Sequence, residues 1–153
     1  MKNRRGLTAV AMAGMMGAMT LASSFSAYAA AGWVQSGNTY VYYDSDGSLH
    51  KGWVNASNGY YYTDLSTGQM VTGWKQINNN WYYFQADGLM ATGWVQDGGK
   101  YYYTLTDGTM HKNGWVNIGS DYYYMGSDGA MVTGWQTIDG GKFYLTRPTA
   151  NVL

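Results

Sequence analysis

The sequence predicts an all-β fold, a solenoid of tandem β-hairpins, and three regularities support that prediction. A Gly-Trp step occurs six times, and the spacings between its Trp residues are 20, 21, 20, 21 and 20. A block of aromatic residues, which suit a pleated surface, follows each step. After residue 30, apolar residues do not recur with the spacing of a helix. A fixed period of this kind indicates one structural unit that is repeated and stacked.

The first 29 residues are predicted to be a secretory signal peptide that is removed from the mature protein. Three basic residues open the chain, an apolar run follows over residues 7–22, and Ala27-Tyr28-Ala29 fits the A-x-A cleavage pattern. The alternative is an uncleaved membrane anchor, but an apolar run of about 16 residues is shorter than the ~20 that a spanning helix needs. We therefore expect a secreted chain that begins near Ala30 and has no membrane span.

The composition after residue 30 excludes several classes of function. Six basic residues and nine Asp leave a net charge of −3, and no basic patch is present, so nucleic acid is not an expected partner. The chain has no cysteine, which excludes disulfides and thiolate metal sites. Its aromatic content of 17% is too high for a disordered linker. Stability is therefore expected to come from aromatic packing between stacked repeats.

Each repeat is predicted to form one hairpin, and the six repeats occupy residues 30–146. The first strand begins at the Gly-Trp step and the aromatic block is the return strand. Asn, Asp and Gly supply the positive φ of hairpin turns. Such turns are Ser57-Asn58-Gly59, Asn78-Asn79-Asn80, Asp97-Gly98-Gly99 and Asp139-Gly140-Gly141. A lone hairpin is only marginally stable in water, so each needs a neighbour. Residues 147–153 are expected to be a loose tail, and whether the chain is complete or a fragment stays open.

The aromatic block places rings on both faces of each hairpin, because side chains alternate along a strand. In the third repeat, Trp81 and Tyr83 share one face, while Tyr82 and Phe84 share the other. One face can be buried in the stack and the other can line a surface groove beside the Gly-Trp ring. A single Tyr is more often a packing residue, but three consecutive aromatics exceed that need. A groove of rings favours either a quaternary ammonium group or a stacked sugar.

Residues suited to catalysis are not grouped in the sequence. His50 and His111 each stand alone in a connector, and residues 44–47 resemble a calcium loop only in part, because the Glu of that motif is missing. The nine Asp are mostly turn residues and do not form the paired carboxylates of a glycosidase. Among them, Asp46, Asp87, Asp107 and Asp128 each precede Gly. We therefore expect no enzyme activity, no metal site and no cofactor.

The repeats resemble the cell-wall-binding, or choline-binding, repeats of Gram-positive surface proteins and of bacterial and phage autolysins. The resemblance covers residues 32–145 and is fullest over residues 73–94, which read GWKQINNNWYYFQADGLMATGW. Related repeats occur in the glucan-binding regions of streptococcal glucosyltransferases and in clostridial toxin tails. The sixth repeat, over residues 134–145, looks more like the toxin type.

The resemblance implies a ligand held between consecutive hairpins. Its cage would contain the Gly-Trp ring and the first block aromatic of one repeat, a Tyr of the next repeat and often a Met. The fullest implied cage is Trp74, Trp81, Tyr103 and Met90. The others are Trp33, Tyr40 and Tyr62, with Leu49 in place of Met; Trp53, Tyr60, Tyr83 and Met70; Trp94, Tyr101, Tyr124 and Met110; and Trp115, Tyr122, Tyr144 and Met131. Which Tyr of the next repeat closes each cage stays open.

Three interpretations of function remain at this point. The first is a secreted, cell-wall-associated, non-catalytic module that binds the choline of teichoic acids, with several weak sites adding avidity. The second is a carbohydrate-binding module for glucan or another cell-wall glycan. Only the third repeat keeps Trp at the first block position, and that departure leaves the second interpretation open. The third is a structural spacer, or the tail of a larger surface protein.

Overall fold

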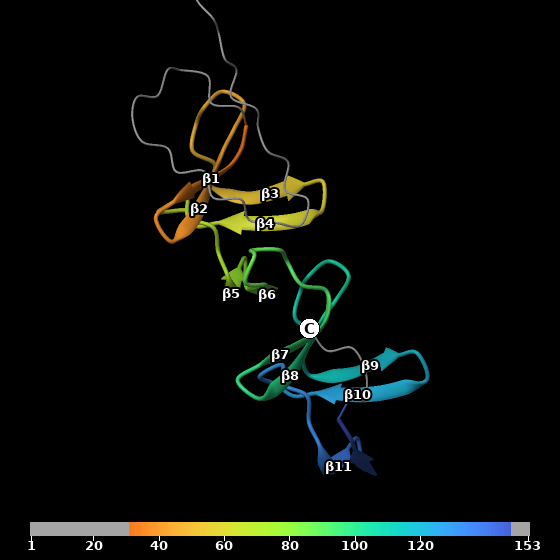
Figure 1. Cartoon of the computed structure of the whole chain (residues 1–153). Coiled ribbons are helices and arrows are strands. Elements are labelled where there is room, and N and C mark those ends of the chain that lie inside the picture. Colours follow the sequence, from red (N-terminus) through yellow and green to blue (C-terminus); the bar gives the residue numbers. More distant parts are fainter. Residues whose placement is uncertain (1–30, 148–153) are drawn as a thin grey trace, which may run out of the picture. The chain divides into compact units, whose positions relative to one another are not determined.

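The computed structural model describes residues 31–147, which form twelve β-strands and no helix. The strands pair into six antiparallel hairpins, one for each Gly-Trp repeat (Figure 1). The pairs are β1 (Gly32–Ser36) with β2 (Thr39–Tyr43), β3 (Gly52–Ala56) with β4 (Gly59–Thr63), β5 (Gly73–Ile77) with β6 (Asn80–Phe84), β7 (Gly93–Asp97) with β8 (Lys100–Thr104), β9 (Gly114–Ile118) with β10 (Asp121–Met125), and β11 (Gly134–Ile138) with β12 (Gly141–Leu145). The predicted all-β fold of tandem hairpins is confirmed.

Two sequence predictions fall outside this part of the chain. The expected signal peptide lies before residue 31, and all but the first residue of the expected tail lies after residue 147. Within residues 31–147, no helix is long and apolar enough to cross a membrane.

The hairpin turns are two residues long where the sequence supplies positive φ. Asn78 and Asn79 join β5 to β6 with φ of 49° and 68°. Gly98 and Gly99 join β7 to β8 with φ of 55° and 76°. Two consecutive left-handed residues match the twist of the flanking strands, which is why Asn and Gly are favoured here. The turn chemistry therefore sets the register of each hairpin.

The register places the Gly-Trp ring and two block positions on one face. In the third hairpin, Trp74 pairs with Tyr83, and Gln76 pairs with Trp81. Lys75 pairs with Tyr82, so these two side chains occupy the opposite face. We call the first face the Trp face and the second the back face. The same pairing recurs in all six hairpins.

The chain divides into two compact units, each with hairpins that pack face to back. The first contains residues 31–72 with 86–89, and the second contains residues 73–85 with 90–147. In the second unit, Trp94, Val116 and Met125 form a buried cluster, and Tyr123 packs against it. The core therefore lies between consecutive hairpins, because a single two-stranded sheet encloses no interior.

Buried threonines tie a connector to the hairpin that follows it. Thr63 and Thr104 end β4 and β8 and are 0% and 1% exposed. The Thr63 hydroxyl donates to the His50 carbonyl at 2.9 Å, and the Thr104 hydroxyl donates to the Ala91 carbonyl at 3.0 Å. β6 and β10 end instead in buried apolar residues. The second and fourth hairpins thus end in a Thr that hydrogen-bonds to the preceding connector, whereas the third and fifth end in a buried apolar residue.

Substituting Val for Thr104 removes the hydroxyl and keeps the shape of the side chain. We expect the free energy of unfolding to fall by about 1 kcal/mol, because the Ala91 carbonyl would lose a buried donor. Urea denaturation of the full chain measures this loss. Thr92→Val is the control, since Thr92 is exposed and its substitution should change stability by less than ~0.5 kcal/mol. Equal effects of the two substitutions would contradict the assigned role.

Candidate functional site

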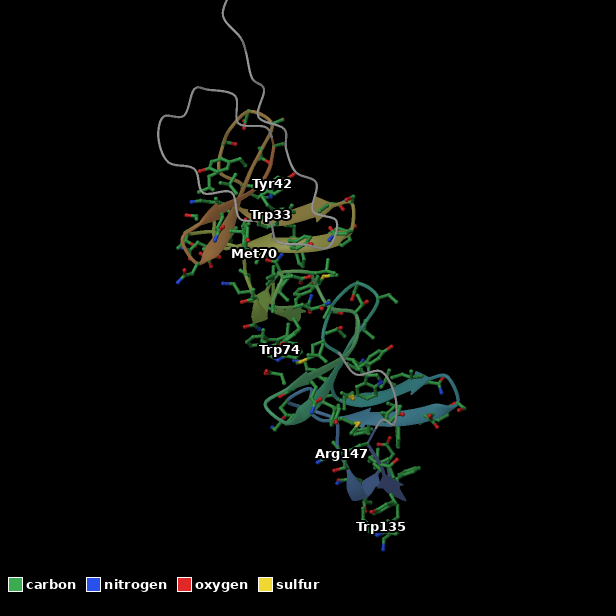
Figure 2. The ribbon with its side chains drawn as sticks, viewed as in Figure 1. Trp33, Tyr42, Met70, Trp74, Trp135 and Arg147 are labelled. Carbon is green, nitrogen blue, oxygen red and sulfur yellow. The ribbon has the colours of Figure 1, made fainter. Side chains whose placement is uncertain are left out.

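Each Gly-Trp ring packs against the aromatic residue at the third position of the block in its own hairpin. Trp33 and Tyr42 lie beside each other in this way on the first hairpin (Figure 2). The centroid distances are 5.2 Å for Trp33–Tyr42, 5.2 Å for Trp53–Tyr62, 5.1 Å for Trp74–Tyr83, 5.3 Å for Trp94–Tyr103, 5.2 Å for Trp115–Tyr124 and 5.3 Å for Trp135–Tyr144. Most of these pairs meet edge to face, which aromatic rings favour. The third aromatic therefore fixes the orientation of the Trp.

The second ring against each Trp comes from the back face of the next hairpin. It is the middle residue of the aromatic block. The centroid distances are 5.2 Å for Trp33–Tyr61, 4.9 Å for Trp74–Tyr102, 4.8 Å for Trp94–Tyr123 and 5.0 Å for Trp115–Phe143. Each Trp in these four pairs is therefore fixed between its own hairpin and the next one.

This ring differs from the one that the family resemblance implied. Tyr103 was expected against Trp74, but it packs on Trp94 of its own hairpin, and Tyr102 takes the expected place. The same holds for Tyr62, Tyr124 and Tyr144. The physical reason is the period of two along a strand, which turns the third aromatic toward its own Trp. The two-face alternation of the aromatic block was the signal that could have identified the middle position.

The methionine whose backbone bonds to the first block aromatic also comes from a different repeat than expected. The connector after a hairpin runs back along the preceding hairpin, and its Met N–H donates to the carbonyl of the first block aromatic there. These bonds are Met70 to Tyr40, Met110 to Trp81 and Met131 to Tyr101, each 2.7 Å. Met131 also packs against the cluster that contains Trp94. The backbone of Met110, in the connector after the next hairpin, is therefore bonded to the backbone of Trp81.

The connector side chains expected in the cages have other neighbours as well. Met90 was expected with Trp74, but its side chain lies against Gly108 in the Asp-Gly turn of the next repeat. Met110 contacts Gly129 in the same way, where an added Cβ would lie 2.5 Å from the Met sulfur. Leu49 lies against Gly68. These glycines have positive φ, so the turn needs glycine both for its backbone and for the side chain that it receives.

We call the group of a Gly-Trp ring, the first aromatic of the same block and the middle aromatic of the next hairpin a hollow. The first aromatic is exposed in three of the hairpins. Tyr60 is 48% exposed, Trp81 is 38% exposed and Tyr122 is 66% exposed. Tyr40 and Tyr101 are partly buried. Tyr101 lies 6.5 Å from Trp94, edge to face. Each hollow thus combines a fixed Trp and a fixed ring of the next hairpin with a ring that solvent can reach.

In the first five hairpins the Trp face carries neutral side chains, and in the sixth it also carries Lys142. The Trp-face position opposite the first block aromatic is occupied by a neutral polar residue in all six hairpins. These residues are Gln35, Asn55, Gln76, Gln96, Asn117 and Thr137. In the described strands, no carboxylate occupies a Trp-face position. On these faces a cation would therefore meet aromatic rings and neutral polar side chains.

Trp53 and Tyr60 lie 6.5 Å apart on the second hairpin, and Tyr83, which was expected with them, packs on Trp74 of its own hairpin. The sixth repeat departs from the common arrangement. In the sixth, Lys142 replaces the first aromatic, and a shallow hollow of about 180 Å³ is lined by Trp135, Gln136, Thr137 and Lys142. Trp135 is 72% exposed (Figure 2). The sixth hairpin therefore combines an open indole face with an ammonium group.

The charged residues of the connectors have local structural roles. The pKa of Asp107 is lowered by hydrogen bonds from the hydroxyl and backbone N–H of Thr109. His50 Nδ1 lies 2.9 Å from Asp44, and its Nε2 lies 2.8 Å from the Trp53 carbonyl. Among residues 31–147, no group of three or more His, Asp or Glu side chains could hold a metal ion. His50 thus joins a connector to β3.

Comparison with known protein families identifies these repeats. The sequence model of the choline-binding repeat matches residues 71–115, and that of a putative cell wall binding repeat matches residues 51–70, 113–131 and 133–146. The matches together cover more than half of the 153 residues. The chain therefore belongs to the choline-binding, or cell-wall-binding, repeat family. No curated protein sequence matches the chain.

Solved structures share the fold. Choline binding protein F from Streptococcus pneumoniae is 35% identical, with a TM-score of 0.68, over 77% of this chain and 43% of that protein. A crystal of that protein with a peptidoglycan analogue gives 35% identity and a TM-score of 0.67, over 76% of this chain and 43% of that one. A pneumococcal cell wall endolysin from phage Cp-1, complexed with choline, is 30% identical, with a TM-score of 0.57, over 76% of this chain and 35% of that one. This chain spans less than half of each relative.

Proposed function

We propose that this protein is a non-catalytic module that holds quaternary ammonium groups, namely the choline of cell-wall teichoic acids, in the hollows between consecutive hairpins. The observation that carries the proposal is the repeated trio of a Gly-Trp ring, an accessible first aromatic and the middle aromatic of the next hairpin. The trios are Trp33, Tyr40 and Tyr61; Trp74, Trp81 and Tyr102; Trp94, Tyr101 and Tyr123; and Trp115, Tyr122 and Phe143. The backbone N–H groups of Met70, Met110 and Met131 donate to the carbonyls of Tyr40, Trp81 and Tyr101 in the first three.

The chemistry of these hollows favours a large, weakly hydrated cation. Each aromatic face within about 6 Å attracts such a cation by ~0.5–2 kcal/mol, and Trp does so best. A trimethylammonium group also offers methyl groups that pack on rings, whereas a hydrated metal ion does not. Each site is weak, but several sites on one chain raise the effective concentration of a polymer that carries many ligands. A repeated ligand such as a teichoic acid suits this arrangement.

The setting of the module is part of the proposal. The predicted signal peptide and the family membership support a secreted, cell-wall-associated protein. The endolysin relative is a longer multimodular protein, and this chain spans only 35% of it. In the described residues, the carboxylates and histidines are dispersed among turns, connectors and strand ends. We therefore assign attachment to this chain and no chemical step.

Retention on a resin that carries trimethylammonium groups tests the proposal. Because residues 31–147 have a net charge of −3, ordinary anion exchange must be suppressed, so the chain is loaded in 1 M NaCl, where the Debye length is about 3 Å. We expect retention at this salt and elution by choline chloride, with no elution by an equal addition of NaCl. Passage of the chain through the resin at 1 M NaCl would contradict the proposal.

A second candidate function is carbohydrate binding, and the sixth hairpin favours it. There Lys142 and Thr137 supply hydrogen-bond donors beside the open face of Trp135, a combination that suits a sugar ring better than a cation. The crystal of choline binding protein F with a peptidoglycan analogue agrees with this possibility. Titration with α-glucan and with soluble peptidoglycan fragments tests it. Quenching of fluorescence in the parent chain, but not in Trp135→Ala, is the expected result.

A further inference from the structure

The Trp94 ring is covered to an extent that its counterparts are not. Its exposed fraction is 7%, against 37% for Trp53 and 72% for Trp135. The rings of Trp33, Trp74 and Trp115 are partly exposed. The repeat sequence gives no reason for this difference, because the fourth repeat keeps the common pattern of Gly-Trp step and aromatic block. Trp94 is covered by the cluster it forms with Val116 and Met125, against which Tyr101 and Tyr123 also pack.

Arg147 contacts Tyr101, which packs against this cluster. It lies two residues after β12, and its guanidinium carbon lies over the Tyr101 ring, 5.9 Å from the ring centroid (Figure 2). That distance is within the ~6 Å range of a cation–π interaction. Tyr101 is the first aromatic of the hollow formed by Trp94, Tyr101 and Tyr123. A cation supplied by the chain itself therefore lies over one of the three rings of this hollow.

The local charges are consistent with a guanidinium held by rings. Among residues 31–147, Arg147 forms no ion pair with a carboxylate, and the Asp128 carboxylate is engaged by Lys100 at 3.2 Å. Arginine suits this position because its planar group stacks on aromatic faces and is more weakly hydrated than an ammonium. Tyr101 is therefore the one described partner that accounts for the placement of the Arg147 side chain.

We propose that the Trp94 hollow is a guanidinium site whose resident ligand is Arg147, so that an external quaternary ammonium group must displace this side chain to bind there. The inference rests on the proposed function in that both ligands use the same rings. It predicts unequal hollows: the Trp74 hollow binds choline directly, whereas the Trp94 hollow binds it in competition with Arg147. Choline must replace the cation–π contact of Arg147 at a partly exposed site. The apparent affinity of the Trp94 hollow for choline should therefore be roughly two- to fivefold lower than it would be without Arg147.

The indole N–H signals of the seven Trp residues allow each hollow to be followed separately by NMR in the full chain. In the parent protein, the Arg147 side-chain protons should be shifted upfield by the Tyr101 ring, and Tyr101→Leu should remove that shift. Choline should also return these protons to their random-coil positions. Random-coil shifts in the parent chain would overturn the proposal, whether or not choline binds anywhere.

Arg147→Ala gives the second readout. The choline concentration that half-saturates the Trp94 signal should fall about two- to fivefold, while the Trp74 titration stays unchanged. Lys112→Ala, which removes another exposed cation of the same unit, is the matched control and should alter neither titration. If Trp74 responds to choline and Trp94 titrates identically in the parent and Arg147→Ala, the inference fails and the proposed function stands. If no indole responds in any variant, the proposed function fails, and the ring shift of Arg147 alone decides the inference.

Discussion

Replacing Met125 by Ala is expected to lower the free energy of unfolding by about 2–5 kcal/mol, the range for removing a buried Met side chain. Met125 is fully buried, with 0% exposure, in the cluster with Trp94 and Val116. The cluster joins two consecutive hairpins, and a repeat protein is stabilised mainly by such nearest-neighbour contacts. Urea denaturation of the full chain, followed by tryptophan fluorescence, measures the change in midpoint at constant slope.

Leu65→Ala is the control for Met125→Ala. Leu65 is 62% exposed in a connector, so its truncation should alter the free energy of unfolding by no more than ~0.5 kcal/mol. A loss at Met125 no larger than the loss at Leu65 would show that the packing between these hairpins contributes little. It would also contradict the view that aromatic and Met contacts between repeats hold this fold together in the absence of disulfides.

Replacing Trp81 by Ala is expected to weaken choline binding in the third hollow by roughly five- to thirtyfold, which corresponds to ~1–2 kcal/mol. The third is the only hollow whose first block position holds Trp, the side chain that attracts cations best. Trp81 is 38% exposed, so it can contact a ligand without leaving a buried cavity when it is removed. Isothermal titration with choline chloride measures the affinity, and the other hollows should continue to bind.

Tyr122→Ala is the matched variant for Trp81→Ala. Tyr122 occupies the same position in the fifth hairpin, where it is 66% exposed, and its loss should reduce choline affinity less than the loss of Trp81. Differential scanning calorimetry on both variants separates binding from packing. If Trp81→Ala lowers Tm while the choline affinity of the folded protein stays unchanged, Trp81 is a packing residue and the binding assignment is wrong.

Much of the architecture could be predicted because local chemistry is repeated in step with it. The positive φ of Asn78 and Asn79 follows from residue types that tolerate left-handed backbone, and it sets a two-residue turn. With the turn in place, the pairing of Trp74 with Tyr83 follows by counting along two strands. These are interactions within twenty residues, and the sequence encodes them directly.

The composition of each hollow could not be derived in the same way. Trp74 receives Tyr102, and the Trp81 carbonyl accepts the backbone N–H of Met110, so the residues involved come from the next hairpin and its connector. Their choice depends on which face of one hairpin meets which face of the next and on the path of the connector between them. The contact between Arg147 and Tyr101 joins residues 46 positions apart and has no periodic signal at all.

The sequence by itself therefore determined the strands, the turns, the register and the family of this protein, because those depend on residue type at fixed short spacing. Only the tertiary structure decided which ring of the next hairpin packs on each Trp, which connector bonds to the first block aromatic and which ring Arg147 lies over. The reason is that back-to-face packing recurs at Trp33, Trp74, Trp94 and Trp115, whereas the contacts it creates depend on the side chains that a neighbouring repeat presents.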